Sequence, residues 1–499
     1  MSARVAYLRP FGHQDYKHSI AATSVAPTCL YFSILSNHLR FCTSCAKLSD
    51  ADNLLPDDLL LETGWNMKTR LLLILLLALG LAGFAQAQDQ VTVTVWMHNH
   101  APRVSIDEEL VAEFMEENPN INVDYQIVDD FFTALQTAMA SGAGPDVFNQ
   151  FTLFNAQFYA QGMLAPVDPV AMGYQTIEDV YAHYGEGLVG ETVLAGDTFN
   201  GVLYGLPTEL SNYACYTNDD LWMEAGLDPA TDFPTTWEGL AEVGEMLTKR
   251  DENGTLVQRG YDFNWSANIY MMLHFDPMVT QLGNSMIDEM TYTADINNEN
   301  VKRVMQYWKD IVDENRGGPQ YTVSRNAFNA GELATECTFG NWGTPGMEEA
   351  GINYSIHNVP RWDDAVNDLG FATYAFYLQV NANAPREVQE AGWKLIAHLT
   401  SQPDRYLNEA ALFQPVASYL ATDEFANNAI MPVFLDELYR GQYHPRFAGF
   451  SEVGDALGRA RDRIILGGED MDAVLQEAED EVNAVLERAQ ADIEAAGGA

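Results

Sequence analysis

The sequence predicts an α/β protein in which sheets are flanked by helices. Strand-like and helix-like segments alternate from residue 91 onward, and no polar linker or low-complexity stretch interrupts them. There is also no internal repeat and no heptad run long enough for a coiled coil. A chain of 499 residues is long enough for two or three domains. The unbroken pattern predicts lobes joined by several strands, because separate domains on a string would need linkers.

The first part of this pattern predicts a parallel sheet. Alternating apolar residues predict strands over 91–95 and 121–127, and a short buried strand is expected over 146–148. Apolar residues at helical spacing predict helices over 106–115 and 131–140. Strands separated by helices form parallel sheets that the helices cover.

Ligands of such sheets bind at the carboxyl ends of the strands. A loop is expected over 98–103, directly after the first of these strands. Four residues are placed on candidate ligand loops by this rule: His98, Asn99, Gln150 and Phe151.

The later elements follow the same logic. Helices are expected over 219–225, 237–247, 301–312, 327–332, 387–399 and 471–495. Strands are expected over 212–217, 335–339 and 371–380. After the strand at 335–339, Trp342 stands between Gly340 and Gly343, which predicts a tight turn that presents its ring.

Composition and motifs argue against several classes of function. The 26 Lys and Arg against 71 Asp and Glu give a net charge of −45, which argues against binding nucleic acid or anionic membranes. No nucleophile elbow, zinc-protease motif or phosphate-binding loop occurs, so neither a catalytic site nor a cofactor is expected. His98 and His100 alone are too few ligands to predict a metal site. A secreted carbohydrate hydrolase stays open, because carboxylates are abundant and such enzymes need only a pair of them.

A secretory signal peptide is predicted at 67–87. The segment 67–70 is basic, 71–82 is almost wholly apolar, and 85–87 has the small-residue pattern of a cleavage site. The simplest explanation of residues 1–66 is then a start codon assigned too early, with Met67 as the true start. The remaining chain has two cysteines, Cys215 and Cys337, for which a disulfide and two free thiols are both open.

Several segments, in this order, resemble family 1 extracellular solute-binding proteins, the receptors of ABC importers. The matching segments are 114–123 (FMEENPNINV), 138–148 (AMASGAGPDVF), 162–168 (GMLAPVD), 204–207 (YGLP), 213–228 (YACYTNDDLWMEAGLD), 234–237 (PTTW), 328–342 (FNAGELATECTFGNW) and 397–416. The resemblance covers nearly all of 88–499 and none of 1–66.

The resemblance implies a two-lobed periplasmic-binding-protein fold with a hinge of crossover strands. Lobe 1 is expected over 88–209 and 362–412, and lobe 2 over 210–361 and 413–499. It also implies a monomeric periplasmic receptor that captures a mono- or oligosaccharide in the inter-lobe cleft. The receptor would deliver that solute to the transmembrane subunits of a permease.

Sugars stack on aromatic rings and need dense hydrogen-bonding groups, which selects candidate ligand residues. Trp342 and Trp265 are the expected stacking rings, and Glu209 is the expected acceptor of sugar hydroxyls. The other expected contacts are Gln150, Asn99, His98, Gly343, Phe413 and Gln414. The alternative ligands are a polyol, a polyamine or a ferric complex, and a local Arg103 or Arg325 would instead favour an anion.

Overall fold

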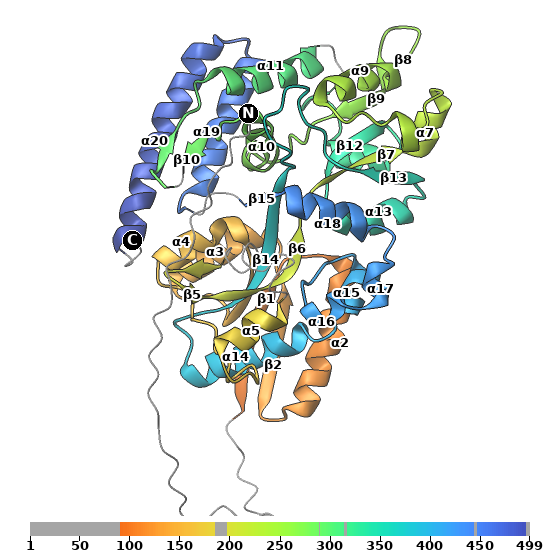
Figure 1. The fold of residues 1–499 in the computed structure, drawn as a ribbon. Helices are drawn as coiled ribbons and strands as arrows, with labels where there is room; N and C mark the ends of the chain where they lie inside the picture. The colour runs from red at the N-terminus through yellow and green to blue at the C-terminus, as the bar shows by residue number, and fades with distance from the viewer. Residues whose placement is uncertain (1–89, 185–196, 289, 314–316, 444–446, 496–499) are drawn as a thin grey trace, which may run out of the picture. The chain divides into compact units, whose positions relative to one another are not determined.

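The structure is a computed structural model, and it describes residues 90–184, 197–288, 290–313, 317–443 and 447–495 (Figure 1). These residues belong to one unit, Ala85–Ala499. The predicted extension at 1–66 and signal peptide at 67–87 lie outside the described residues. Within those ranges, no helix combines the length and apolar character needed to cross a bilayer.

The first sheet has the strand order β15–β14–β3–β1–β2, and β6 also pairs with β14. β1 is parallel to β2 and β3, as predicted, whereas β14 is antiparallel to β3 and β6. Its strands are β1 (Val91–Met97), β2 (Ile121–Ile127), β3 (Val147–Phe151), β6 (Gly205–Ser211), β14 (Ala372–Val380) and β15 (Gln442–Tyr443). The associated helices are α2 (Ala101–Glu117), α3 (Phe131–Ser141), η2 (Thr152–Phe154), α4 (Asn155–Ala160), α5 (Ile177–His183), α14 (Arg386–Leu399), α15 (Pro403–Ala410), α16 (Ala417–Leu420) and α17 (Asp423–Ala426).

The second sheet has the order β13–β7–β12–β9–β8. Its strands are β7 (Ala214–Asn218), β8 (Lys249–Arg250), β9 (Leu256–Asp262), β12 (Leu333–Phe339) and β13 (Tyr354–His357). The helices between β7 and β13 in the chain are α7 (Asp219–Glu224), α8 (Pro229–Asp232), α9 (Trp237–Leu247), η3 (Met271–Phe275), α10 (Asp276–Thr280), α11 (Glu299–Asp313), α12 (Ser324–Asn329), η4 (Asn341–Gly343) and α13 (Thr344–Glu349). Three further helices come after β14 in the chain: α18 (Met431–Arg440), α19 (Phe450–Ile465) and α20 (Met471–Ala495). Two short hairpins complete the described elements: β4 (Thr198–Phe199) with β5 (Val202–Leu203), and β10 (Ile287–Asp288) with β11 (Thr293–Ala294).

Three local predictions were wrong. The expected loop at 98–103 is shorter, because α2 already begins at Ala101 with Pro102 in its first turn. Proline is tolerated there, since the first N–H groups of a helix have no partner within it. β3 continues to Phe151 because it pairs with β14 up to Phe376, so Gln150 and Phe151 lie in a strand and not in a loop. The short helix predicted at 327–332 is shifted to α12, Ser324–Asn329.

The chain passes between the two sheets with very little intervening structure. Only Asn212 and Tyr213 separate β6 of the first sheet from β7 of the second. The segment 358–371 leads back from β13 to β14. The lobe boundaries predicted at 209/210, 361/362 and 412/413 stay a prediction.

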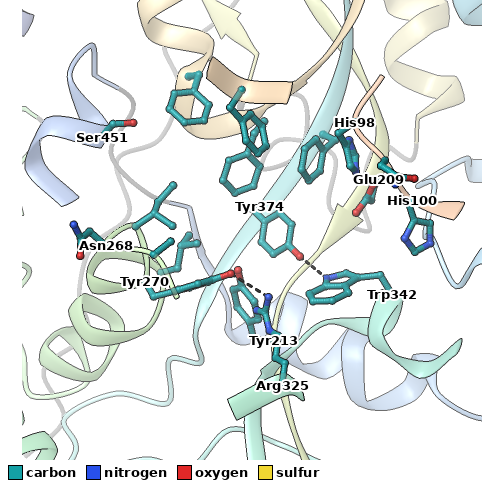
Figure 2. Close-up of a pocket in the computed structure, with 18 of the residues that line it drawn as sticks. His98, His100, Glu209, Tyr213, Asn268, Tyr270, Arg325, Trp342, Tyr374 and Ser451 are labelled. Atoms are coloured by element: carbon teal, nitrogen blue, oxygen red, sulfur yellow. Dashed lines mark hydrogen bonds and ion pairs between the residues drawn. The ribbon is translucent and has the colours of Figure 1, made fainter. Parts of the chain in front are cut away.

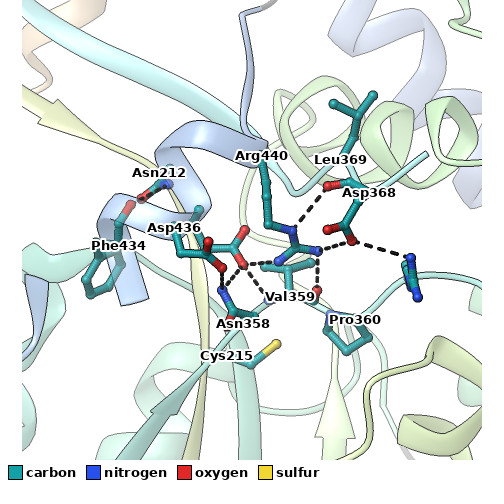
Figure 3. Close-up of polar contacts among 12 residues, drawn as sticks. Asn212, Cys215, Asn358, Val359, Pro360, Asp368, Leu369, Phe434, Asp436 and Arg440 are labelled. Carbon is teal, nitrogen blue, oxygen red and sulfur yellow. Dashed lines mark hydrogen bonds and ion pairs between the residues drawn. The ribbon is translucent and has the colours of Figure 1, made fainter. Parts of the chain in front are cut away.

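α18 contacts both of these connections (Figure 3). On the first connection, the Asn212 side-chain amide donates to the Phe434 carbonyl at 3.3 Å. On the second, Arg440 donates to the Val359 carbonyl at 3.0 Å. Glu437, which is 1% exposed, accepts a hydrogen bond from the Val359 N–H at 3.0 Å. One helix therefore holds the two segments that join the sheets.

A disulfide joins Cys215 of β7 to Cys337 of β12. Both residues are fully buried in the second sheet. The disulfide is therefore the alternative that the structure supports, and it closes a loop of 122 residues.

Candidate ligand-binding site

A cavity of about 590 Å³ is lined by elements of both sheets. The first sheet contributes residues that follow β1 and side chains from β3, β6 and β14. Elements associated with the second sheet contribute Arg325 of α12, Trp342 of η4 and residues beside η3, and α19 contributes Ser451 and Asp455. The cavity is large enough for a sugar-sized solute.

Aromatic rings form much of its wall. Tyr374 and Phe376 are two residues apart on β14, so their side chains project from the same face. The Phe151 ring lies 5.3 Å from the Tyr374 ring and 5.0 Å from the Phe376 ring. Phe132 stacks on Phe376 at 6.2 Å. This arrangement offers apolar faces on which a flat ligand surface can pack.

Trp342 lies on the same cavity, beside Tyr374 (Figure 2). Its indole N–H donates to the Tyr374 hydroxyl at 2.6 Å, which fixes the orientation of the ring. The ring also contacts Phe339 edge-on at 5.8 Å. A Cβ on Gly340 would clash with the indole nitrogen, which favours glycine where the strand turns into η4. The sequence prediction of a ring presented by a tight turn is thus realised as a 3₁₀ turn.

Arg325 also lines the cavity and lies over two aromatic rings, those of Trp342 and Tyr270. Its guanidinium carbon is 4.8 Å from the Trp342 ring centre and 5.2 Å from that of Tyr270. It donates to the Tyr270 hydroxyl at 3.1 Å and to the Thr338 carbonyl at 3.0 Å. Arginine therefore ties α12, the residue before η3 and the end of β12 together at the cavity.

Glu209 of β6 brings a carboxylate to the cavity. Its side chain is only 6% exposed and lies 3.6 Å from the Arg103 guanidinium. Arg103 also lies 3.3 Å from Asp107, which accepts hydrogen bonds from Tyr125 and Tyr406, each at 2.6 Å. Burial raises the pKa of Glu209 to about 7, although Arg103 opposes that effect. One oxygen of Glu209 accepts no hydrogen bond among the described residues; it is the oxygen that lies 3.6 Å from Arg103.

His98 is neutral at the cavity. Burial lowers its pKa well below the usual value, and the neighbouring Arg103 lowers it further. The 3.8 Å contact between His98 and Glu209 is therefore not an ion pair. The ring stacks on Phe376 at 4.2 Å and hydrogen-bonds to Asn149, which holds it in place.

Four of the predicted site residues line the cavity: His98, Asn99, Glu209 and Trp342. Five others do not: Trp265, Gln150, Gly343, Phe413 and Gln414.

Each of these five has other surroundings. The Trp265 ring packs under Arg461 at 4.3 Å and beside Trp308 at 6.2 Å. Gly343 packs against Phe339, Phe413 stacks on Phe425, and Gln150 and Gln414 are each 1% exposed. Their assignment as ligand contacts therefore has no support from this cavity.

Sequence reasoning missed the aromatic wall of β14. Every residue of that strand is buried, so no alternation between apolar and polar residues distinguishes the face that meets the cavity. Tyr270 was missed as well, and the irregular π-helical turn that follows it has no simple sequence signal. Among the described residues, no group of three or more His, Cys, Asp or Glu side chains is arranged to hold a metal ion.

Comparison with known proteins places this geometry in a family. A sequence model of the bacterial extracellular solute-binding protein family matches residues 99–405. A maltotriose-binding protein of Pyrococcus abyssi is 21% identical over 396 residues, covering 78% of this chain and 81% of the relative.

Two solved structures show the same fold. One is an ABC transporter solute-binding protein of Thermotoga lettingae bound to α-D-tagatose, with a TM-score of 0.68, 19% identity, and coverage of 80% of this chain and 100% of that one. The other is UgpB of Mycobacterium tuberculosis in complex with glycerophosphocholine, with a TM-score of 0.66, 18% identity, and coverage of 80% and 98%. The predicted two-lobed fold is confirmed. Because the family model spans well over half of the 499 residues, the chain belongs to the bacterial extracellular solute-binding protein family.

Proposed function

We propose that this protein captures a carbohydrate in the cavity and delivers it to the transmembrane subunits of an ABC permease. The observation that carries the proposal is the combination of stacking surfaces with a carboxylate that lacks a hydrogen bond on one oxygen, in one cavity. The rings are those of Trp342, Tyr374 and Phe376, and the carboxylate is that of Glu209.

The physical basis is the two-sided chemistry of a sugar. One face of a pyranose ring carries C–H groups, which pack on aromatic rings, while the hydroxyls need donors and acceptors. Glu209 supplies an acceptor whose strength increases because its surroundings are dry. Such a buried acceptor also rejects solutes that leave it unpaired. Closure of the two lobes around the solute would remove the remaining water.

Export to the periplasm and a monomeric state belong to the same proposal. The predicted signal peptide at 67–87 supports export, and the family to which the chain belongs is extracellular.

A thermal-shift screen tests the proposal directly. The exported protein is heated with neutral and acidic sugars, polyols, polyamines and glycerophosphodiesters. A ligand at 100 times its dissociation constant adds about 2.7 kcal/mol to the free energy of unfolding. At about 2–4 °C per kcal/mol, the melting temperature should rise by several degrees with one class of sugar.

The other outcomes are equally informative. A shift with polyamines or glycerophosphodiesters alone would refute the carbohydrate assignment and leave the receptor fold intact. Release of a shorter sugar from an oligosaccharide would show a hydrolase. A shift with none of the solutes would contradict the proposal.

A further inference from the structure

Arg325 has hydrogen-bonding capacity that the protein does not use. A guanidinium has five N–H donors. Arg325 makes three hydrogen bonds among the described residues: two to the Thr338 carbonyl and one to the Tyr270 hydroxyl. Two N–H groups therefore stay free, one on each terminal nitrogen. The residue is partly exposed and lines the cavity, so a ligand can reach these donors.

Arg325 also makes no direct ion pair among the described residues. In the part of the chain that the structure describes, no carboxylate lies within 4 Å of its guanidinium, whereas Arg103 has Asp107 at 3.3 Å and Glu209 at 3.6 Å. The nearby Glu336 hydrogen-bonds to Thr338 instead. Burial raises the pKa of Glu336, while Thr338 and the charge of Arg325 oppose that effect, so Glu336 acts on Arg325 only from a distance.

The aromatic rings around Arg325 do not account for this arrangement. Arg303 lies over the Trp362 ring at 4.7 Å, as close as Arg325 lies to Trp342. Yet Arg303 also makes ion pairs with Glu238 at 2.9 Å and Asp364 at 2.8 Å. Elsewhere in this protein, then, an arginine above a tryptophan still has carboxylate partners. At the cavity, by contrast, no carboxylate of the described residues lies within 4 Å of the Arg325 guanidinium.

The overall net charge of −45 does not prevent an anion from binding there. Surface charges are screened beyond about 8 Å at physiological ionic strength. Inside the cavity an anion would lie close to the Arg325 guanidinium, where screening is weak. The planar guanidinium also matches a carboxylate or a phosphate, because it can donate two parallel hydrogen bonds to either group.

We propose that the carbohydrate bound by this protein is acidic, and that its carboxylate or phosphate occupies the free fork of Arg325. Glu209 then accepts hydroxyl hydrogen bonds elsewhere on the same solute. Figure 2 draws Arg325 and Glu209 on opposite sides of the Tyr374 and Trp342 rings, with the stacking surface between them. This inference rests on the proposed carbohydrate function and specifies its substrate class.

The test compares matched sugars by isothermal titration calorimetry. D-galacturonate and D-glucuronate, and oligomers of each, are measured against galactose and glucose, and glucose 6-phosphate separates phosphate from carboxylate. For the wild-type protein we expect at least tenfold tighter binding of the acidic member of one pair. Arg325→Gln should reduce that preference about 10- to 100-fold, on the scale of hydrogen bonds to charged groups. Arg325→Lys should restore part of it, because charge returns without the fork.

Arg303→Gln is the matched control, because it removes the same charge from above a tryptophan outside the cavity. It should leave the preference unchanged. The ratio of acidic to neutral affinity is the readout, so a general loss from disturbing Trp342 would cancel. Equal affinity for acidic and neutral sugars in the wild type would overturn this inference while the carbohydrate function stands, and that result needs no variant to fold. Binding of no sugar of either kind would refute both.

Discussion

Replacing Trp342 by alanine should weaken ligand binding while the fold persists. The ring lies on the cavity and is partly exposed, so removing it takes away a stacking surface and opens no sealed void. The transfer term for a buried aromatic side chain is about 1–3 kcal/mol, which corresponds to about a 5- to 150-fold loss of affinity. The Tyr374 hydroxyl also loses the donor at 2.6 Å, which costs about 1 kcal/mol in stability.

The assay is titration calorimetry with the solute found in the thermal-shift screen, together with urea unfolding of each variant. Trp265→Ala is the matched control: Arg461 lies 4.3 Å from its ring as Arg325 lies 4.8 Å from that of Trp342, but Trp265 does not line the cavity. Trp342→Phe should retain most of the affinity because stacking survives without the indole N–H. Unchanged affinity in Trp342→Ala, or an equal loss in Trp265→Ala, would refute the stacking assignment.

Three further predictions concern titration and cross-linking. Because the pKa of Glu209 is about 7 and hydroxyls donate to its ionised form, affinity should fall by up to tenfold per pH unit below 7 and level off above it; calorimetry on Glu209→Gln should show no such slope. Burial also raises the pKa of Glu437 to about 7, so its folded state holds the proton more tightly than the unfolded state, and stability should decline from about pH 4.5 to 7. Urea unfolding should then show Glu437→Gln gaining about 1–3 kcal/mol relative to the wild type between pH 5 and 8, and a constant difference would contradict this. Reducing the Cys215–Cys337 disulfide should lower the free energy of unfolding by about 2–5 kcal/mol, and identical urea curves with and without reductant would count against a structural role.

Sequence patterns predicted most elements because their periodicity is local. The strand at 121–127 and the helices at 237–247 and 471–495 have the predicted bounds. The errors arose where tertiary pairing decides the outcome. β3 runs on to Phe151 only because β14, more than 200 residues later, pairs with it.

The site was harder to predict for the same reason. Trp342 and Glu209 have local signals, a glycine-flanked turn and a position just after a characteristic segment, and both line the cavity. The ring of Tyr374 and the free donors of Arg325 depend on which surfaces meet, which no local pattern records. Trp265 carries a similar local signal to Trp342, but Arg461 and Trp308 occupy its faces.

The contacts of α18 would allow a probe on the protein surface to detect closure of the two lobes. This helix hydrogen-bonds to Asn212 on one inter-sheet connection and to Val359 on the other, so a change in hinge angle must alter its environment. Tyr439 on the same helix is 65% exposed and does not line the cavity. A fluorophore attached there through a Tyr439→Cys substitution would sense the open-to-closed transition without competing for the solute. The receptor thereby offers a natural attachment point for an optical biosensor.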